Sequence, residues 1–414
     1  MPGAYFRKRR YAGSKDRRAV TERLFKILRN RARLDWWIVR ANAQVEPSPR
    51  ARVLADLMLR DRLDESAAAA LFGGTQYAPA PLSPVERGLA ASLEGQPFDH
   101  PTMPAWVRGE CPEWLDAPLR ELYGERFEAE LAALNEPAPL DARVNIFRGS
   151  REEIRTALRE QGVESKPARF SPVGLRIEGH PRLTHTPAYK DGLIEVQDEG
   201  SQLAALMAEP EPRHTVIDFC AGAGGKTLAL VDAMIRDGRF DGLLWACDTI
   251  PSRLAELEKR ARRAGVHEAI LIHAFTENDP WLGENEACAD RVLLDVPCSG
   301  TGAWRREPEA KGRLTEQSVG AFVVLQRRIL ERAATLVKPG GRLIYVTCSI
   351  LSAENEEQIA WFLEAAPAFS ARPAGPIWQR VTGAEAPVET PFVRLSPAAT
   401  GTDGFFIAVL ERSK

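Results

Sequence analysis

Apolar residues between positions 16 and 43 recur three, four or seven places apart, with arginines mostly between them. That spacing is typical of an amphipathic helix with one face toward a core. Helices are predicted at 16–43, at 51–71 (as one or two) and at 112–134, with a proline-rich loop at 78–84. The prolines of Glu136–Pro139 mark a domain boundary, so residues 1–135 are expected to form a helical domain.

The pattern after this boundary is that of a small α+β module. Short β-rich runs at 143–147 and 174–178 predict strands. Ser150 is followed three residues later by Glu153, a capping box that predicts a helix over 150–161. We expect this module to span residues 136–196.

Strands and helices alternate from residue 215 onward. Such alternation implies right-handed βαβ units and a parallel sheet, so the fold class is α/β, with a Rossmann-like domain over 197–414. Pro339-Gly-Gly341 is expected to end the long helix and to precede the fifth strand. The predicted strands are 215–219, 243–247, 269–273, 291–295, 343–347 and 405–410, and the predicted helices are 227–236, 252–264, 317–337 and 354–364.

Charge is distributed unevenly, although the chain of 414 residues is nearly neutral, with 55 Lys and Arg against 57 Asp and Glu. Residues 1–34 hold twelve basic and two acidic residues, a net +10, and because the total is −2 the remainder carries −12. A basic segment of this kind attracts nucleic-acid phosphates by counterion release. A solvated helix face is the alternative interpretation.

Composition narrows the class of protein further. With 44% hydrophobic and 27% charged residues, the chain is globular rather than disordered, and no apolar run approaches the roughly 20 residues of a membrane helix. The six cysteines form no CxxC pair and the six histidines show no ligand spacing, so neither disulfides nor a metal are expected. No secretory signal follows Met1–Arg10, which predicts a cytoplasmic protein with reduced thiols.

Three glycines stand where the first strand of the alternating region turns into a helix, in Cys220-Ala-Gly-Ala-Gly-Gly-Lys226. They let the backbone pass close to a ligand at the carboxyl edge of the sheet, and their spacing excludes a P-loop. Asp248 ends the second strand and is placed to accept the ribose hydroxyls of NAD or S-adenosylmethionine equally well. The structural alternative for Asp248 is a helix cap before Pro251.

Two cysteines occupy matching positions just beyond the fourth and fifth strands. Cys298 lies in Asp295-Val-Pro-Cys-Ser299, and Cys348 lies in Thr347-Cys-Ser349. A buried cysteine is usually inert packing, but two at adjacent strand ends, each followed by serine, point to chemistry at the crevice. The packing interpretation is kept for Cys111, Cys247 and Cys288.

These motifs resemble those of the RNA 5-methylcytosine methyltransferases of the Sun/Nop family, and most of all the B type that acts on small-subunit ribosomal RNA. The resemblance runs from about Ala142 to Leu410 and rests chiefly on the paired PCS and TCS motifs. It implies a Rossmann-like class I methyltransferase domain, a preceding module like an RNA recognition motif, and an N-terminal helical domain of the NusB kind. It also includes Arg143-Val-Asn145, Val196–Gln202, Asp218–Thr227, Glu354-Asn355 and Gly404-Phe-Phe406.

The resemblance assigns roles as well. Cys348 is expected to be the nucleophile that bonds to carbon 6 of cytosine, and Cys298 to help release the product. Asp295 is expected between the cofactor and the base. S-adenosylmethionine is the implied cofactor, and its binding residues are Cys220, Ala221, Gly222, Ala223, Gly224, Gly225, Lys226, Asp248 and Asp295.

The chain departs from the family pattern at three places, one of which is an N-terminal helical region shorter than expected for a full NusB-type domain. Ala223 stands where the family usually has proline, and no residue of the run 273–279 is assigned to the adenine contact that the family makes with an Asp after the third strand. For RNA, basic residues after the PCS motif are expected to meet phosphates and Trp304 to stack on a nucleotide, with a structural loop as the alternative. The basic residues concerned are Arg305, Arg306, Lys311 and Arg313.

The sequence thus predicts a monomeric enzyme that methylates carbon 5 of a cytosine in RNA, with ribosomal RNA as the expected partner and neither membrane nor metal involved. Three alternatives stay open: a non-catalytic RNA-binding or ribosome assembly factor with a relic methyltransferase fold, a methyltransferase acting on transfer RNA, and an NAD-dependent oxidoreductase. A measurement of S-adenosylmethionine binding distinguishes the enzyme from the assembly factor. The oxidoreductase hypothesis does not explain why two cysteines flank the site.

Overall fold

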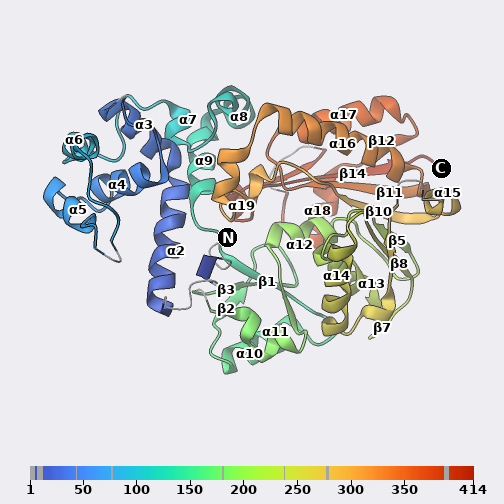
Figure 1. Ribbon diagram of the computed structural model, residues 1–414. Helices are drawn as coiled ribbons and strands as arrows, with labels where there is room; N and C mark the ends of the chain where they lie inside the picture. Colours follow the sequence, from blue (N-terminus) through green and yellow to red (C-terminus); the bar gives the residue numbers. More distant parts are fainter. Residues whose placement is uncertain are drawn as a thin grey trace. The chain divides into compact units, whose positions relative to one another are not determined.

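The computed structural model describes residues 5–6, 13–42, 44–75, 78–179, 181–236, 238–276, 279–386 and 391–414. The chain divides by its contacts into two units, Met1–Glu136 with Glu307–Arg313, and Pro137–Arg306 with Leu314–Lys414 (Figure 1). The segment Glu307–Arg313 follows the PCS motif, yet it packs with the helical unit. The basic cluster 7–10 and the last residue of the first predicted helix, Ala43, lie outside the described residues.

The first unit is helical, with shorter helices than the periodicity predicts. The predicted helix 16–43 is broken at Asn30, whose backbone (φ −115°, ψ 25°) leaves helical geometry. The run 112–134 is divided at Gly124, where φ is +53°. Leu34 and Ile38 still face a common apolar core with Leu54. The helices are α2 (Ser14–Arg29), α3 (Arg31–Ala41), α4 (Pro49–Leu59), α5 (Glu65–Leu71), α6 (Pro84–Leu93), α7 (Ala105–Arg108), α8 (Asp116–Tyr123) and α9 (Phe127–Asn135).

The second unit begins with a four-stranded antiparallel sheet of order β2-β3-β1-β4. Its chain order is β-α-β-β-α-β, the arrangement of ferredoxin-like folds and RNA recognition motifs. The capping box at Ser150 is confirmed, since its side chain accepts the Glu153 backbone N–H. The first strand lies three residues before its predicted position. The elements are β1 (Leu140–Val144), α10 (Arg151–Glu160), β2 (Ser165–Pro167), β3 (Gly174–Ile177), α11 (Pro187–Lys190) and β4 (Ile194–Val196).

The rest of the second unit is a three-layer α/β fold around an eight-stranded sheet of order β12-β14-β11-β10-β5-β8-β9, with β13 paired to β14. The five strands from β11 to β9 are parallel, as predicted, and β14 runs antiparallel to β11. These strands are β5 (Thr215–Asp218), β8 (Leu243–Asp248), β9 (Ile270–Ala274), β10 (Ala289–Asp295), β11 (Val337–Thr347), β12 (Phe369–Ala371), β13 (Val393–Leu395) and β14 (Phe405–Arg412), beside a small hairpin of β6 (Ile235–Arg236) and β7 (Arg239–Phe240).

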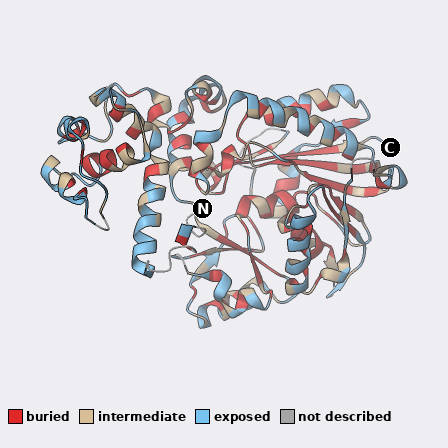
Figure 2. Ribbon diagram, in the orientation of Figure 1, coloured by how far each residue is buried: buried red, intermediate tan, exposed pale blue. Residues whose placement is uncertain are grey.

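Helices cover both faces of this sheet. Successive strand residues point to opposite sides, and apolar residues on both sides are buried under helices. Ile344 belongs to the core under α12, α13, α14 and α18, whereas Tyr345 belongs to the core under α15, α16 and α17. Figure 2 shows the strands buried and the helices exposed on their outer sides. The helices are α12 (Glu199–Leu206), α13 (Gly225–Met234), α14 (Pro251–Ala264), α15 (Trp281–Glu284), α16 (Glu316–Ala334), α17 (Glu356–Ala365), α18 (Ala374–Thr382) and α19 (Pro397–Thr400).

The predicted boundaries between the long helix and the fifth parallel strand are also wrong. The long helix ends at Ala334 rather than at residue 337, and Pro339-Gly-Gly341 lies inside β11 instead of before it. Gly340 takes a φ of +75° there, and the pairing of β10 with β11 shifts register over the same stretch. The glycines thus form an irregularity within a strand. Among the described residues, no helix is long and apolar enough to span a membrane.

Candidate active site

The two motif cysteines meet at the carboxyl ends of neighbouring parallel strands. Asp295 of β10 pairs with Val346 of β11, so the loops that follow leave the sheet side by side. The Sγ atoms of Cys298 and Cys348 are 3.4 Å apart. Both residues are half-buried, and the Gly302 N–H donates to the Cys348 carbonyl at 2.9 Å. The pairing therefore brings the two thiols into contact at one edge of the sheet, and we call this pair the two-thiol site.

This site lies where the strand order reverses. From β5 the chain proceeds to β8 and β9 on one side, and it then returns to β10 on the other. Ligands of open α/β sheets bind outside the carboxyl ends of the strands at such a switch point. The loop Cys220–Gly224, which follows β5, therefore borders the same crevice as the loop that carries Cys298.

The glycine turn has the backbone geometry that a cofactor loop requires. Gly222 and Gly224 have φ of +55° and +83°, conformations that other residues adopt at a cost. A Cβ on Gly224 would lie 2.4 Å from Leu257 Cγ, so the loop also passes tightly over α14. Arg260 of α14 donates to the Ala223 carbonyl at 2.7 Å, a restraint that the sequence did not reveal.

Asp248 is fixed by backbone donors at the end of β8. Its Oδ2 accepts the Gly222 N–H at 2.8 Å, and its Oδ1 accepts the Ile250 N–H at 2.8 Å. The carboxylate thus orders the glycine turn and the start of α14 together. Each oxygen keeps a second lone pair, so the residue can still accept a ribose hydroxyl.

Three charged groups meet between the glycine turn and the cysteines. Lys226 Nζ lies 2.7 Å from Asp295 Oδ2. Burial by itself lowers the pKa of Lys226, but the charges of Asp295 and of Cys348 outweigh it, and the pKa is raised. Burial raises the pKa of Asp218 to about 7. Its Oδ2 accepts from Thr227 Oγ1 at 2.7 Å, while its buried Oδ1 has no hydrogen-bond partner within the described part of the chain.

These residues fit a nucleoside cofactor with a cationic tail. The orphan oxygen of Asp218 calls for a donor, the glycine turn admits close approach, and Asp248 faces the same crevice. S-adenosylmethionine carries an ammonium, a sulfonium and a ribose, which match these groups in charge and donor character.

Comparisons with known proteins agree with this geometry. A family model described as 16S rRNA methyltransferase RsmB/F matches residues 205–411, and a model for the ferredoxin-like domain of RsmF/B-like methyltransferases matches residues 111–184. The chain belongs to the RsmB/F methyltransferase family. Its members depend on S-adenosylmethionine, and the Sun/Nop-type resemblance predicted from the sequence is confirmed.

Individual relatives support the same assignment. The probable ribosomal RNA small subunit methyltransferase B of Synechocystis is 31% identical over 96% of this chain and 92% of its own length. Ribosomal RNA small subunit methyltransferase B of Pasteurella multocida is 33% identical over 73% of this chain, which spans 65% of that relative. Among solved structures, PH0851 is 29% identical, with a TM-score of 0.76 over 98% of this chain and 93% of its own. A methyltransferase homolog from Pyrococcus horikoshii is 28% identical, with a TM-score of 0.62 over 74% of this chain and 97% of its own.

In this RsmB/F-family chain, several residues predicted to contact RNA are buried instead. Trp304 is 1% exposed, so it cannot stack on a nucleotide. Arg305 is 5% exposed and binds Asp403, and Lys311 lies within the helical unit, where its Nζ donates to Asn135 at 2.9 Å. Arg306 is partly exposed but is paired with Asp198 at 2.8 Å. Of the five, only Arg313 is exposed.

The run 273–279 at the end of β9, to which no adenine contact was assigned, also has a structural role. Asp279 accepts the backbone N–H groups of Thr276 and Trp281 at 3.1 and 3.0 Å, and it bonds His273 Nε2 at 2.9 Å. These contacts give Asp279 a structural role in the segment between β9 and α15.

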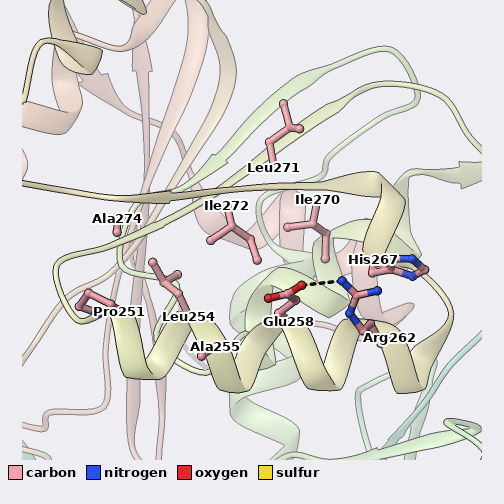
Figure 3. A pocket seen from close by; sticks show the side chains of 10 residues that line it. All are labelled: Pro251, Leu254, Ala255, Glu258, Arg262, His267, Ile270, Leu271, Ile272 and Ala274. Carbon is pink, nitrogen blue, oxygen red and sulfur yellow. Dashed lines mark hydrogen bonds and ion pairs between the residues drawn. The ribbon is translucent and has the colours of Figure 1, made fainter.

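A cavity of about 500 Å³ lies between α14 and β9, away from the thiols. Its lining is mostly apolar, and the Glu258–Arg262 ion pair at 2.6 Å crosses one end (Figure 3). No cysteine lines it.

Proposed function

We propose that this protein transfers the methyl group of S-adenosylmethionine to carbon 5 of a cytosine in small-subunit ribosomal RNA. The observation that carries the proposal is the contact between Cys298 and Cys348 at the switch point of the sheet, beside the glycine turn. The substrate follows the family, described as acting on 16S rRNA, and the relatives named ribosomal RNA small subunit methyltransferase B.

Carbon 5 of cytosine is a poor nucleophile, and a thiolate overcomes this difficulty. Cys348 Sγ bonds to carbon 6, and the ring becomes enamine-like at carbon 5. The ammonium of Lys226 interacts electrostatically with Cys348. When bound, S-adenosylmethionine supplies the electrophilic methyl group. A general base then takes the carbon 5 proton, and the electron pair of that C–H bond forms the carbon 5–carbon 6 double bond. The Sγ–carbon 6 bond breaks, and its electron pair returns to Cys348.

Cys298 is suited to proton handling rather than to attack. The hydrogen bond with Cys348 and burial raise its pKa well above the usual range, so it remains a neutral thiol beside the reacting ring. Asp295, held by Lys226, lies at the edge of the same crevice and can bind the polar edge of cytosine. A base stacked in a duplex cannot reach either thiol, so the target must be unpaired or flipped out.

The two cysteines give opposite predictions on substitution. Cys348→Ala abolishes methyl transfer and forms no covalent RNA adduct, whereas Cys298→Ala accumulates an adduct that denaturing gels resolve. Cys288→Ala is the matched control and behaves as wild type, because that thiol lies at the start of β10, away from the crevice. Full activity of Cys348→Ala contradicts the nucleophile assignment.

The substrate is tested separately, by bisulfite mapping of cellular RNA with and without the protein. A single cytosine of small-subunit ribosomal RNA loses its protection when the protein is absent. Loss confined to transfer RNA would replace the substrate assignment, and binding of S-adenosylmethionine without methylation of any RNA would favour the assembly factor.

A further inference from the structure

One buried carboxylate connects the loops that carry the two cysteines. Glu354 is 0% exposed. Its Oε1 accepts the Ser299 backbone N–H at 2.9 Å and the Gln326 side-chain amide at 3.0 Å. Its Oε2 accepts the hydroxyls of Ser299 and Ser349. Each serine directly follows one of the cysteines, so a single side chain bonds both motifs.

Glu354 itself is held in place from two sides. Its carbonyl accepts the Tyr345 hydroxyl at 2.7 Å. The next residue, Asn355, accepts from Thr347 Oγ1 at 2.6 Å and donates to the Ser349 carbonyl at 2.9 Å. These bonds fix the connection between β11 and α17, and with it the direction in which the carboxylate points.

We propose that Glu354 is a positioning residue that keeps the Cys298 and Cys348 loops in register, so that both thiols act on one base. The role deepens the proposed function and rests on it. The four bonds to the carboxylate come from neutral donors, and bonds to an ionised acceptor are about twice as strong as neutral ones. A neutral amide at this position has one acceptor oxygen and one donor nitrogen, so it cannot accept from both loops in the same way.

The perturbation is Glu354→Gln, which keeps the shape of the side chain and removes half of its acceptor capacity. Glu357→Gln is the matched control, the same substitution at an exposed position of α17. We expect kcat to fall by about 10²-fold in Glu354→Gln, the size of effect that a displacement of about 1 Å in a reacting group produces. The affinity for S-adenosylmethionine stays unchanged, because the hydrogen bonds of the Glu354 carboxylate go to Ser299, Gln326 and Ser349 and not to the glycine turn, Asp248 or Asp295.

A second measurement reports on the thiols without any substrate. Treatment with diamide joins Cys298 and Cys348 as a disulfide, and the two protons and two electrons released pass to the diamide, which becomes a hydrazine. Intact-mass spectrometry in a Cys111→Ala/Cys220→Ala/Cys247→Ala/Cys288→Ala background follows the rate. The rate falls at least tenfold in Glu354→Gln and is unchanged in Glu357→Gln. Ser349→Ala, which loses one of the four bonds, gives an intermediate rate and serves as the measure if Glu354→Gln does not fold.

The two readouts separate this inference from the function on which it rests. Equal oxidation rates in wild type, Glu354→Gln and Ser349→Ala overturn the positioning role even if RNA is methylated. Slower oxidation in a protein that methylates no RNA supports the positioning of the loops and overturns the proposed function. A fall in kcat shared by Glu357→Gln assigns the effect to the fold of α17 and refutes the role of Glu354.

Discussion

Replacing Gly224 by alanine tests the glycine turn, because the structure separates two physical costs there. Gly224 has φ of +83°, and a Cβ would lie 2.4 Å from Leu257 Cγ and 2.9 Å from its Cδ1. Leu257 is 0% exposed and belongs to the core under α14, where it packs among other buried side chains. Gly222 also has a positive φ, +55°, but a Cβ there meets only the Cys220 carbonyl oxygen at 4.0 Å.

The expected magnitudes follow from these distances. Left-handed backbone costs an alanine about 1–2 kcal/mol, and overpacking a closed core costs about 1–3 kcal/mol. Gly222→Ala therefore lowers the free energy of unfolding by about 1–2 kcal/mol, and Gly224→Ala by about 2–5 kcal/mol. The difference between the two variants isolates the clash with Leu257.

The assay is urea unfolding of the full chain. Hydrogen exchange of the peptides from α13 and α14 shows whether the loss of stability is located there. Calorimetry with S-adenosylmethionine measures the effect on the cofactor loop, and both variants bind more weakly. Adding Leu257→Ala to Gly224→Ala removes the clash. The double variant therefore loses less unfolding free energy than the two single variants lose together. Equal destabilisation by the two glycine substitutions, or additivity in the double variant, would refute the steric argument.

Three further predictions concern charged residues. Arg260→Gln weakens binding of S-adenosylmethionine about tenfold in calorimetry, which corresponds to the loss of one charge-assisted hydrogen bond. Adding Ala223→Pro to this variant restores the affinity, because proline restrains the same turn. An unchanged affinity in the double variant would contradict the role of Arg260 in holding the turn. Burial raises the pKa of the Asp218 carboxyl from 3.8 to about 7, so the folded state binds the carboxyl proton more tightly than the unfolded state does. The free energy of unfolding therefore falls as the pH rises from about 4 to about 7. A pH series of urea titrations shows a shallower fall in Asp218→Asn. Arg143→Ala leaves the Asp232 carboxylate buried without its ion-pair partner and costs about 3–5 kcal/mol, whereas Arg143→Met/Asp232→Leu stays near wild type; equal losses would exclude a charge effect.

The arrangement of the site was predictable because its signals are local. A short apolar run followed by glycines or by Pro-Cys-Ser identifies a strand end from neighbouring residues alone. The parallel sheet then places all such ends at one edge, so Cys298 and Cys348 were expected at one crevice. The contact of 3.4 Å between their sulfurs was not predictable, because it depends on the relative register of β10 and β11.

The errors have the opposite origin, since they involve partners that are distant in the sequence. Arg305 was expected to meet phosphates, but Asp403, 98 residues away, neutralises it in the interior. Burial lowers the pKa of Lys311 to about 8, although the charge of Glu110 opposes this effect. A basic residue is exposed by default, and only the tertiary structure reveals the acid that permits its burial.

The buried charged residues of the second unit lie where two separate segments of the chain meet. Arg143 and Asp232 join β1 to α13, Arg305 and Asp403 join the PCS loop to the segment before β14, and Glu354 joins the two cysteine loops. Each contact links segments that local signals leave independent. Apolar contacts would stabilise the same junctions at least as well, but they tolerate sliding, whereas a buried charge is satisfied in one register only. We infer that these groups set the alignment of the loops around the crevice, while the apolar core beneath the sheet supplies most of the stability.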